Sequence, residues 1–526
     1  MSRPFPWWLV LAMAAWAFLL FSRLGYYALW DDESLAALSA KAIQATGDTS
    51  VLLDHDNIVA YRDGLCVHDF ADRSTPPLAA YITAMSFDCF GISAFTARLP
   101  FALFGLGTGA LLLLWARELT TPARWVLLAA MFGNVSLILF CRQCSHDSPA
   151  IFFSLAIVFV LWRWKPSVWQ LTILAVLSVC LFAANFMSYV ALYAVLAVDY
   201  LAWRRKEHPL GWSGLVLLFL PQIILNGAIA SVWNPFHTAF GSYEAANTLF
   251  DRLMLFTWCW RDMDRCEFFS ISLLLLALAV GIVQGRAWLV RGVAALIVYV
   301  AVIALTSPQP IRQSMETEVR YVTPVLPLVI ALQAGALVAL LEKRAAVLAI
   351  AAALAFGTNL FNGGPFMAWG TRSTILSYLG ELSLPQAEPY TPTAAWINAN
   401  VPANKSVWAT PYYTAYPLMF AAPNVHYAWQ LTWPARPDFA SLPPIDFAGR
   451  VSPDYIVAFG PAQGALAQIE SQHMLPDFHY QLVQTIPVYW KDMYRPELYW
   501  RLFETMSAFD PDRAGVFIYR KTAASQ

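Results

Sequence analysis

Eleven apolar runs fill the first two thirds of the chain, and most approach the roughly 20 residues that an α-helix needs to cross a bilayer. Each run is continuously hydrophobic, which is typical of a helix surrounded by lipid. They predict helices near residues 7–22, 98–116, 125–141, 149–162, 168–186, 188–203, 211–230, 270–284, 289–306, 322–341 and 345–362. We therefore expect a mainly α polytopic membrane protein with about 11–13 transmembrane helices.

Basic residues gather in alternate connections between these runs, and this alternation orients the helices. The basic connections contain Arg117 to Arg124, Arg163 and Lys165, Arg204 to Lys206, Arg286 and Arg291, and Lys343 and Arg344. Short cytoplasmic loops carry an excess of Lys and Arg. The rule places the long connections 24–97, 231–269 and 307–321 on the opposite, external side, together with everything after about residue 363.

The pattern changes near residue 386, where polar residues and prolines become frequent. Alternating runs predict strands at SVWAT, DYIVAFG, YQLVQTI and GVFIYR, and the stretches TAAWINAN and ALAQIESQ predict helices between them. We expect three parts. These are a transmembrane domain over residues 1–362, a linker over 363–385 and an external α/β domain over 386–526.

Composition supports this membrane assignment and excludes one class of partner. Hydrophobic residues make up 59% of the chain and charged residues only 13%, about half the fraction usual in soluble proteins. The formal net charge is −1, so no strong positive field attracts nucleic acid. We see no internal repeat of the kind that marks many transporters.

The first external connection, residues 24–97, has structure of its own. SLAALSAKAIQAT carries a helical apolar stripe and predicts a helix lying in the membrane interface. Asp63-Gly64 stands between alternating apolar residues and predicts a hairpin turn. Pro76-Pro77 opens a second predicted helix, because proline is favoured in the first helical turn.

Acidic residues occur at two external helix ends. Asp31, Asp32 and Glu33 precede the first interfacial helix, and Asp147 follows the third apolar run beside His146. One interpretation is structural, since carboxylates stabilise the positive end of a helix dipole and cap helices. The other is chemical, because neighbouring carboxylates raise one another's pKa and then act as general bases.

The order of these motifs resembles the polyprenyl-phosphate-sugar-dependent GT-C membrane glycosyltransferases, which include protein O-mannosyltransferases and bacterial aminoarabinose transferases. The matching motifs are Asp32-Glu33, Gly47-Asp48, Asp63-Gly64, Pro76-Pro77, Ala97 to Pro100, Arg142 to Asp147, and RYVTPVLPL over 320–328. The resemblance covers about the first 170 residues and 310–330. One departure is Thr75, where the aminoarabinose branch has a lysine.

The resemblance implies an inverting transfer of a sugar from a polyprenyl-phosphate donor to a lipid, glycan or protein acceptor. It implies catalytic roles for Asp32, Glu33 and Asp147, with Asp32 as general base. It implies donor-phosphate contacts from Arg73, Arg98, Arg142 and Arg320, since guanidinium groups match phosphate oxygens. It also suggests substrate contacts from Asp31, His146 and Tyr321.

Several alternatives remain at this point. Arg98 and Arg320 stand at span ends, where arginines also extend toward the interface without any ligand. A transporter or flippase of lipid-linked sugars is the rival function. No metal-ligand spacing joins the external histidines, so we expect no obligatory cofactor, with a divalent metal as an unsupported alternative. The resemblance further implies a bacterial inner membrane protein with a periplasmic catalytic side.

Overall fold

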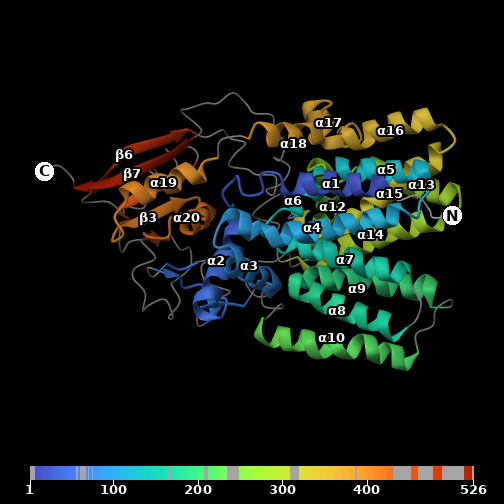
Figure 1. Cartoon of the computed structure of the whole chain (residues 1–526), viewed down its shortest axis with the longest axis horizontal. Coiled ribbons are helices and arrows are strands. Elements are labelled where there is room, and N and C mark those ends of the chain that lie inside the picture. Colours follow the sequence, from blue (N-terminus) through green and yellow to red (C-terminus); the bar gives the residue numbers. More distant parts are fainter. Residues whose placement is uncertain are drawn as a thin grey trace.

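A computed structural model of the chain describes residues 6–54, 57–59, 67–68, 70–73, 75–163, 167–205, 211–233, 248–307, 319–385, 388–429, 452–459, 478–487 and 515–523. Figure 1 shows an elongated molecule with a bundle of long helices at one end and a small sheet at the other. The helices α2 and α3 lie between these two parts (Figure 1).

All eleven apolar runs form helices, which confirms the predicted helical membrane domain. Five of these helices are long and apolar enough to cross a membrane, and five shorter helices are similarly apolar. The bundle contains α1 (Trp7–Phe21), α4 (Ala94–Ala116), α5 (Thr121–Gly133), α6 (Val135–Phe140), α7 (Asp147–Trp162), α8 (Val168–Ala184), α9 (Phe186–Asp199) with η3 (Tyr200–Arg204), α10 (Trp212–Val232), α13 (Ile271–Val283), α14 (Ala287–Thr306), η4 (Val319–Val325) with α15 (Leu326–Leu341), and α16 (Ala345–Gly357).

The run predicted near 125–141 forms two helices rather than one. Asn134 separates them: its side-chain oxygen accepts a hydrogen bond from the backbone N–H of Leu137 and caps α6. Its amide nitrogen donates to the carbonyl of Phe268, which holds the break in place. At Gly133 a Cβ would lie 2.0 Å from the carbonyl oxygen of Phe356, so only glycine permits the close approach of α16.

The connections that we predict to be external contain more helix than the apolar runs alone predict. The expected helices in the first connection are α2 (Asp31–Thr46) and α3 (Pro77–Phe90), and a short antiparallel hairpin joins β1 (Val67–His68) to β2 (Ala71–Asp72). The predicted turn at Asp63-Gly64 lies outside the described residues. Further helices are α12 (Leu249–Arg265) in the 231–269 connection, and α17 (Gly363–Trp369) and α18 (Thr374–Ser383) within the stretch predicted as a linker.

The C-terminal part is the predicted α/β unit. Its five-stranded sheet has the order β4-β3-β5-β7-β6, in which β4, β3 and β5 are parallel and β7 is antiparallel to both its neighbours. The elements are α19 (Tyr390–Asn400), β3 (Ser406–Thr410), η5 (Tyr412–Thr414), α20 (Ala415–Ala421), β4 (His426–Ala428), β5 (Tyr455–Phe459), β6 (Phe478–Pro487) and β7 (Gly515–Ala523). All four predicted strands are confirmed, whereas β4 and α20 were not predicted; ALAQIESQ lies outside the described residues.

The connection 24–97 and the C-terminal unit share one hydrophobic core. Leu38 of α2 is fully buried in the same cluster as Tyr427 of β4. The side chain of Asn57 donates to the carbonyl of Val425 at 2.8 Å and accepts from the backbone N–H of Tyr427 at 2.7 Å. The indole of Trp429 donates to the carbonyl of Ile58. The sheet therefore holds the loop that carries the acidic cluster.

Candidate active site

The acidic cluster opens α2 and meets the late RYVTP stretch. Asp32 lies in the first turn of α2 and forms an ion pair with Arg320 of η4. The Asp32 side chain is 24% exposed and the Arg320 side chain 21% exposed, so solvent reaches both. The N-cap residue is Trp30, whose side chain makes no capping hydrogen bond, and Asp31 is the first residue of the helix. The three carboxylates nonetheless stand where the helix dipole favours negative charge.

Asp147 is the first residue of α7 and is buried. Its carboxylate accepts a hydrogen bond from the Ser145 hydroxyl at 2.8 Å and lies 3.2 Å from the Thr323 hydroxyl. The same Thr323 oxygen lies 2.6 Å from the carbonyl oxygen of Arg320. The alternative that Asp147 caps its helix is wrong, since His146 occupies the N-cap position. Through Thr323, one turn of η4 connects both acidic sites.

His146 and Tyr321 complete this group, which we name the Asp32–Asp147 site (Asp32, His146, Asp147, Arg320, Tyr321 and Thr323). The two rings stack with centroids 6.4 Å apart and planes 22° apart. The His146 Nε2 lies 4.0 Å from a carboxylate oxygen of Asp147, and the Arg320 guanidinium lies 5.5 Å from the centroid of the Tyr321 ring. Asp31 is half-buried in the same turn as Asp32.

Glu33 and Arg98 form a buried pair instead of joining that site. The Arg98 guanidinium donates to Glu33 Oε1 at 2.8 Å through Nε and to Oε2 at 2.5 Å through Nη2. Its other donors go to the carbonyls of Leu24, Tyr27 and Ala28. An arginine has five N–H donors, so this set engages all of them. Glu33 is 0% exposed. The geometry favours a structural role for both residues.

The Glu33–Arg98 pair fixes the two acidic segments relative to each other. Arg98 holds the connection between α1 and α2, and Glu33 is the next residue after Asp32. Glu33 Oε1 also accepts from the backbone N–H of Cys144 at 2.8 Å, three residues before Asp147. Both aspartates are thereby anchored to the same buried carboxylate.

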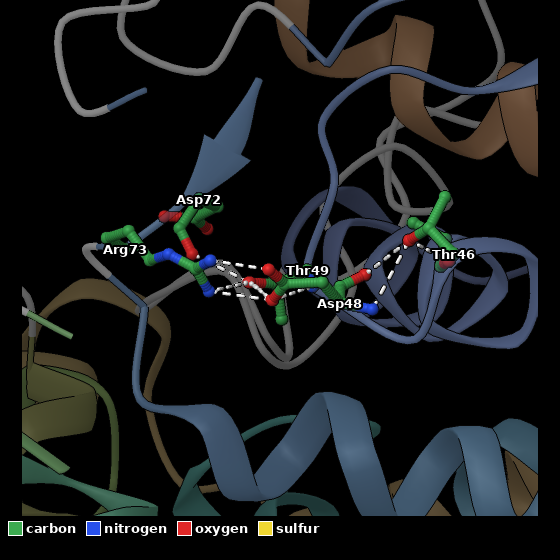
Figure 2. Close-up of polar contacts among 6 residues, drawn as sticks. Thr46, Asp48, Thr49, Asp72 and Arg73 are labelled. Atoms are coloured by element: carbon green, nitrogen blue, oxygen red, sulfur yellow. Dashed lines mark hydrogen bonds and ion pairs between the residues drawn. The ribbon is translucent and has the colours of Figure 1, made fainter. Parts of the chain in front are cut away.

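The remaining predicted phosphate contacts lie in other surroundings. Arg142 donates to the carbonyls of Leu19 and Ser22 and contacts the Tyr378 hydroxyl, so it binds the end of α1. Figure 2 shows Arg73 paired through two nitrogens with Asp48, the residue that follows the C-cap of α2. The hydrogen bond from Arg73 lowers the pKa of the Asp48 carboxyl below its usual value.

An apolar, partly open cavity of about 220 Å³ lies beneath the Asp32–Asp147 site. Its walls come from α7, α9, α14 and α15. At one end the cavity reaches Tyr299 of α14 and Pro324 of η4. At the other end it reaches Asp199, whose carboxylate forms ion pairs with Arg204 and Arg291. Within the described ranges, no three His, Cys, Asp or Glu side chains gather closely enough to hold a metal ion.

Comparisons with known proteins identify the fold. No family model matches the chain. A curated protein from Aquifex aeolicus (strain VF5), described as uncharacterized, is 29% identical over 147 residues; the match spans 28% of this chain and about a quarter (27%) of that protein. ArnT from Cupriavidus metallidurans in the apo state superposes over 97% of both chains, with a TM-score of 0.56 and 14% identity. The chain has the ArnT fold.

The structure of ArnT bound to undecaprenyl phosphate gives the same result, with a TM-score of 0.55, 14% identity, and coverage of 97% of this chain and 98% of that one. Because the ArnT fold extends over nearly the whole chain, the prediction of a GT-C-like membrane domain with a C-terminal α/β unit is confirmed. At this identity the likeness concerns the fold.

Sequence reasoning missed the residue that connects the two acids. Thr323 lies inside the RYVTPVLPL stretch, but threonine is common at the start of a helix, so the sequence gives no reason to single it out. Its hydroxyl comes within hydrogen-bond distance of Asp147 only because η4 packs against the start of α7 in the folded bundle. The same is true of Ser145, which holds the second oxygen of Asp147.

Proposed function

We propose that this protein is a glycosyltransferase that moves a sugar from a polyprenyl-phosphate donor to an acceptor, with inversion, at the Asp32–Asp147 site. The observation that carries the proposal is the meeting of Asp32, Arg320 and Asp147 from three distant parts of the chain. The shared fold with ArnT, solved with undecaprenyl phosphate, supports a lipid-phosphate donor. The catalytic side is external, in a bacterial inner membrane.

In the proposed reaction, an acceptor oxygen attacks the anomeric carbon while the bond from that carbon to the phosphate oxygen breaks. The acceptor proton passes to the Asp32 carboxylate, which is accessible at the rim of the site. The leaving phosphate takes the electron pair of the broken bond, and Arg320 neutralises its charge. Since Arg320 pairs with Asp32 when no donor is present, a bound phosphate competes for the guanidinium and releases the base.

The other members of the site orient these groups. Asp147 and Thr323 hold η4 against α7, which fixes the direction of Arg320. His146 and Tyr321 present a stacked pair of rings beside the ion pair. The cavity reaches Pro324 of η4, four residues after Arg320, and its apolar walls suit an isoprenoid chain.

The substitution Asp32→Asn tests the assignment of the base. We expect sugar transfer to fall by about 10²–10⁴-fold, the usual contribution of a general base. Donor binding should persist, because Arg320 keeps its charge. Transfer is measured with a radiolabelled lipid-phosphate sugar and the purified protein, and donor binding by isothermal titration.

Asp88→Asn is the matched control, since Asp88 is an exposed carboxylate on the neighbouring α3. It should leave transfer unchanged. Full activity of Asp32→Asn would reject Asp32 as the base. Donor translocation across vesicles without any product would favour the rival flippase.

A further inference from the structure

The cavity beneath the Asp32–Asp147 site has a charged end that lies away from that site. Of the residues that line the cavity, the charged ones are Asp199, Arg204 and Arg291, and they lie at the end opposite η4. Arg291 precedes Tyr299, at the η4 end, by about two turns of α14, or about 12 Å along its axis. None of the six residues of the Asp32–Asp147 site lines the cavity. The cavity therefore combines a charged mouth with a mostly apolar body.

One carboxylate holds both guanidinium groups at this mouth. Asp199 Oδ1 accepts from Arg291 Nε at 3.1 Å and from its Nη2 at 2.7 Å, and Asp199 Oδ2 lies 2.7 Å from Arg204 Nε. Arg204 Nη1 also donates to the carbonyl of Leu161 at 3.2 Å. Within the described part of the chain, these contacts leave Arg204 Nη2 and Arg291 Nη1 without a hydrogen-bond partner. The Arg204 side chain is 32% exposed and the Arg291 side chain 29%, so both groups are open to a ligand.

The backbone is irregular at the same place. The segment η3 is a single π-helical turn that follows α9 and ends at Arg204. In a regular α-helix, side chains three or four residues apart are neighbours, whereas a whole π turn separates Asp199 from Arg204. The wide turn brings Arg204 back beside Asp199 and into the cavity wall. Such π turns are rare and occur frequently at functional sites.

Charge and aromatic residues indicate what kind of molecule fits this mouth. Two guanidinium groups face one carboxylate, so the group carries an excess of one positive charge. The Arg291 guanidinium lies 5.4 Å from the centroid of the Trp203 ring. Three more tryptophans line the cavity at helix ends next to the basic connections, namely Trp115, Trp162 and Trp288. Because tryptophan is enriched at the level of lipid headgroups, the charged mouth lies at headgroup depth.

We propose that this mouth binds a membrane lipid with an anionic phosphate headgroup. Arg204 and Arg291 hold the phosphate, since guanidinium groups match phosphate oxygens, and one acyl chain lies along the apolar walls. A free inorganic anion would balance the charge but would leave the apolar body of the cavity unfilled. The donor chain proposed above enters at the η4 end, whereas this lipid enters at the other, so the proposal stands without the sugar transfer.

The test measures lipid binding to the purified full-length protein, without donor, by native mass spectrometry in neutral detergent. The probes are phosphatidylglycerol and phosphatidylcholine with identical long acyl chains. We expect wild type to retain one phosphatidylglycerol and to bind phosphatidylcholine at least tenfold more weakly. Arg291→Gln should bind phosphatidylglycerol at least tenfold more weakly than wild type, because it removes the excess charge, whereas Arg291→Lys should retain most of the binding.

Two further variants make the result specific. Arg204→Gln should show the same loss as Arg291→Gln, and in each variant Asp199 keeps one arginine partner, so the fold should persist. Thermal unfolding without lipid checks this. Arg286→Gln is the matched control, because Arg286 is an exposed arginine just before α14 that does not line the cavity. It removes the same charge and should bind like wild type.

A short-chain lipid tests the position of the acyl chain. Dihexanoyl phosphatidylglycerol carries the same headgroup and should bind at least tenfold more weakly than the long-chain lipid. Loss in Arg291→Gln with binding retained in Arg286→Gln supports the proposal. Equal loss in both variants would assign binding to general surface charge. That result, equal binding of phosphatidylcholine, or equal binding of the short-chain lipid would each overturn the proposal.

Discussion

Arginine side chains near the end of the bundle that carries α2 differ in how completely their donors are engaged. Arg98 donates all five of its N–H groups, to the Glu33 carboxylate and to three backbone carbonyls. Arg320 pairs with one partly exposed carboxylate. Both residues look alike in the sequence, since each stands at the outer end of an apolar run. The sequence therefore indicates where cations lie, whereas their roles depend on partners far away along the chain.

The buried pair predicts a large loss of stability on substitution. Arg98→Leu leaves Glu33 as an uncompensated buried charge, so we expect the free energy of unfolding to fall by about 3–5 kcal/mol. The control is Arg163→Leu, whose partner Glu118 is 44% exposed. An exposed pair contributes only about 0–1 kcal/mol. Denaturant unfolding in detergent measures both, and equal losses would refute a structural role for Arg98.

The Asp48–Arg73 pair predicts a dependence of stability on pH. Arg73 lowers the pKa of Asp48 in the folded state, so the pair stabilises the fold above the ordinary aspartate pKa of about 3.9. This stabilisation disappears as the pH falls through the lowered folded value. Asp48 is 45% exposed, so the effect is small.

We expect Asp48→Asn to lower the unfolding midpoint at pH 7 and to approach wild type as the pH falls below about 3.9. Thermal unfolding across this range measures the difference. The midpoint difference at pH 7 should also shrink at high salt, because exposed ion pairs are screened. A difference that persists unchanged at low pH would assign it to packing instead.

At the scale of elements, η4 is the part that periodicity describes least well. The apolar run predicts a helix near 322–341, and α15 confirms most of it. The preceding turn is a 3₁₀ helix that contains Pro324 and carries Arg320, Tyr321 and Thr323. Helical periodicity detects a helix by its continuous hydrophobic face. The short 3₁₀ helix η4 has no such face, so periodicity does not predict it. Its contacts with α2 and α7 arise only in the folded bundle.

The cavity beneath η4 predicts a dependence on donor chain length. Ala295 of α14 lines it, and Ala295→Phe adds an aromatic ring to that wall. We expect the KM for a long polyprenyl-phosphate donor to rise by about tenfold or more, equivalent to about 1.4 kcal/mol of lost binding. The KM for a short-chain donor should change much less, since its tail does not reach Ala295.

The adjacent Ala294→Phe is the matched control for this experiment. Ala294 does not line the cavity, so neither donor should be affected. Steady-state kinetics with donors of two chain lengths measure the effect. Equal changes for both donors in Ala295→Phe would show that the cavity does not hold the lipid chain.

At the scale of the whole molecule, composition predicted the C-terminal unit but not its attachment. In the structure α19 begins at Tyr390, close to the change in composition near residue 386, and the sheet follows it. Yet Leu38 and Asn57 of the first external connection are buried against the C-terminal unit. A boundary inferred from composition cannot reveal a core shared by segments more than 300 residues apart, such as Asn57 and Val425. The first connection and the C-terminal sheet therefore pack as one unit at one end of the helical bundle.

The orientation of that unit across the membrane is a prediction from basic loops alone, and native Cys89 offers a direct test. Cys89 is exposed near the end of α3. This helix lies beside α2 (Figure 1). Glu118 lies at the opposite end of the bundle, between α4 and α5, in a basic connection. A membrane-impermeant maleimide distinguishes the two positions.

Cys66 lies in the same connection, so the experiment starts from Cys66→Ser. We expect intact bacterial spheroplasts to label Cys66→Ser and not the double variant Cys66→Ser/Cys89→Ser, which serves as the control for the other cysteines. In the double-variant background, Glu118→Cys should label only after the membrane is permeabilised. This pattern follows because the basic ends of the helices remain in the cytoplasm. The reverse pattern would place the Asp32–Asp147 site in the cytoplasm, where nucleotide-linked sugars compete as donors, and would remove the reason for a lipid-linked donor.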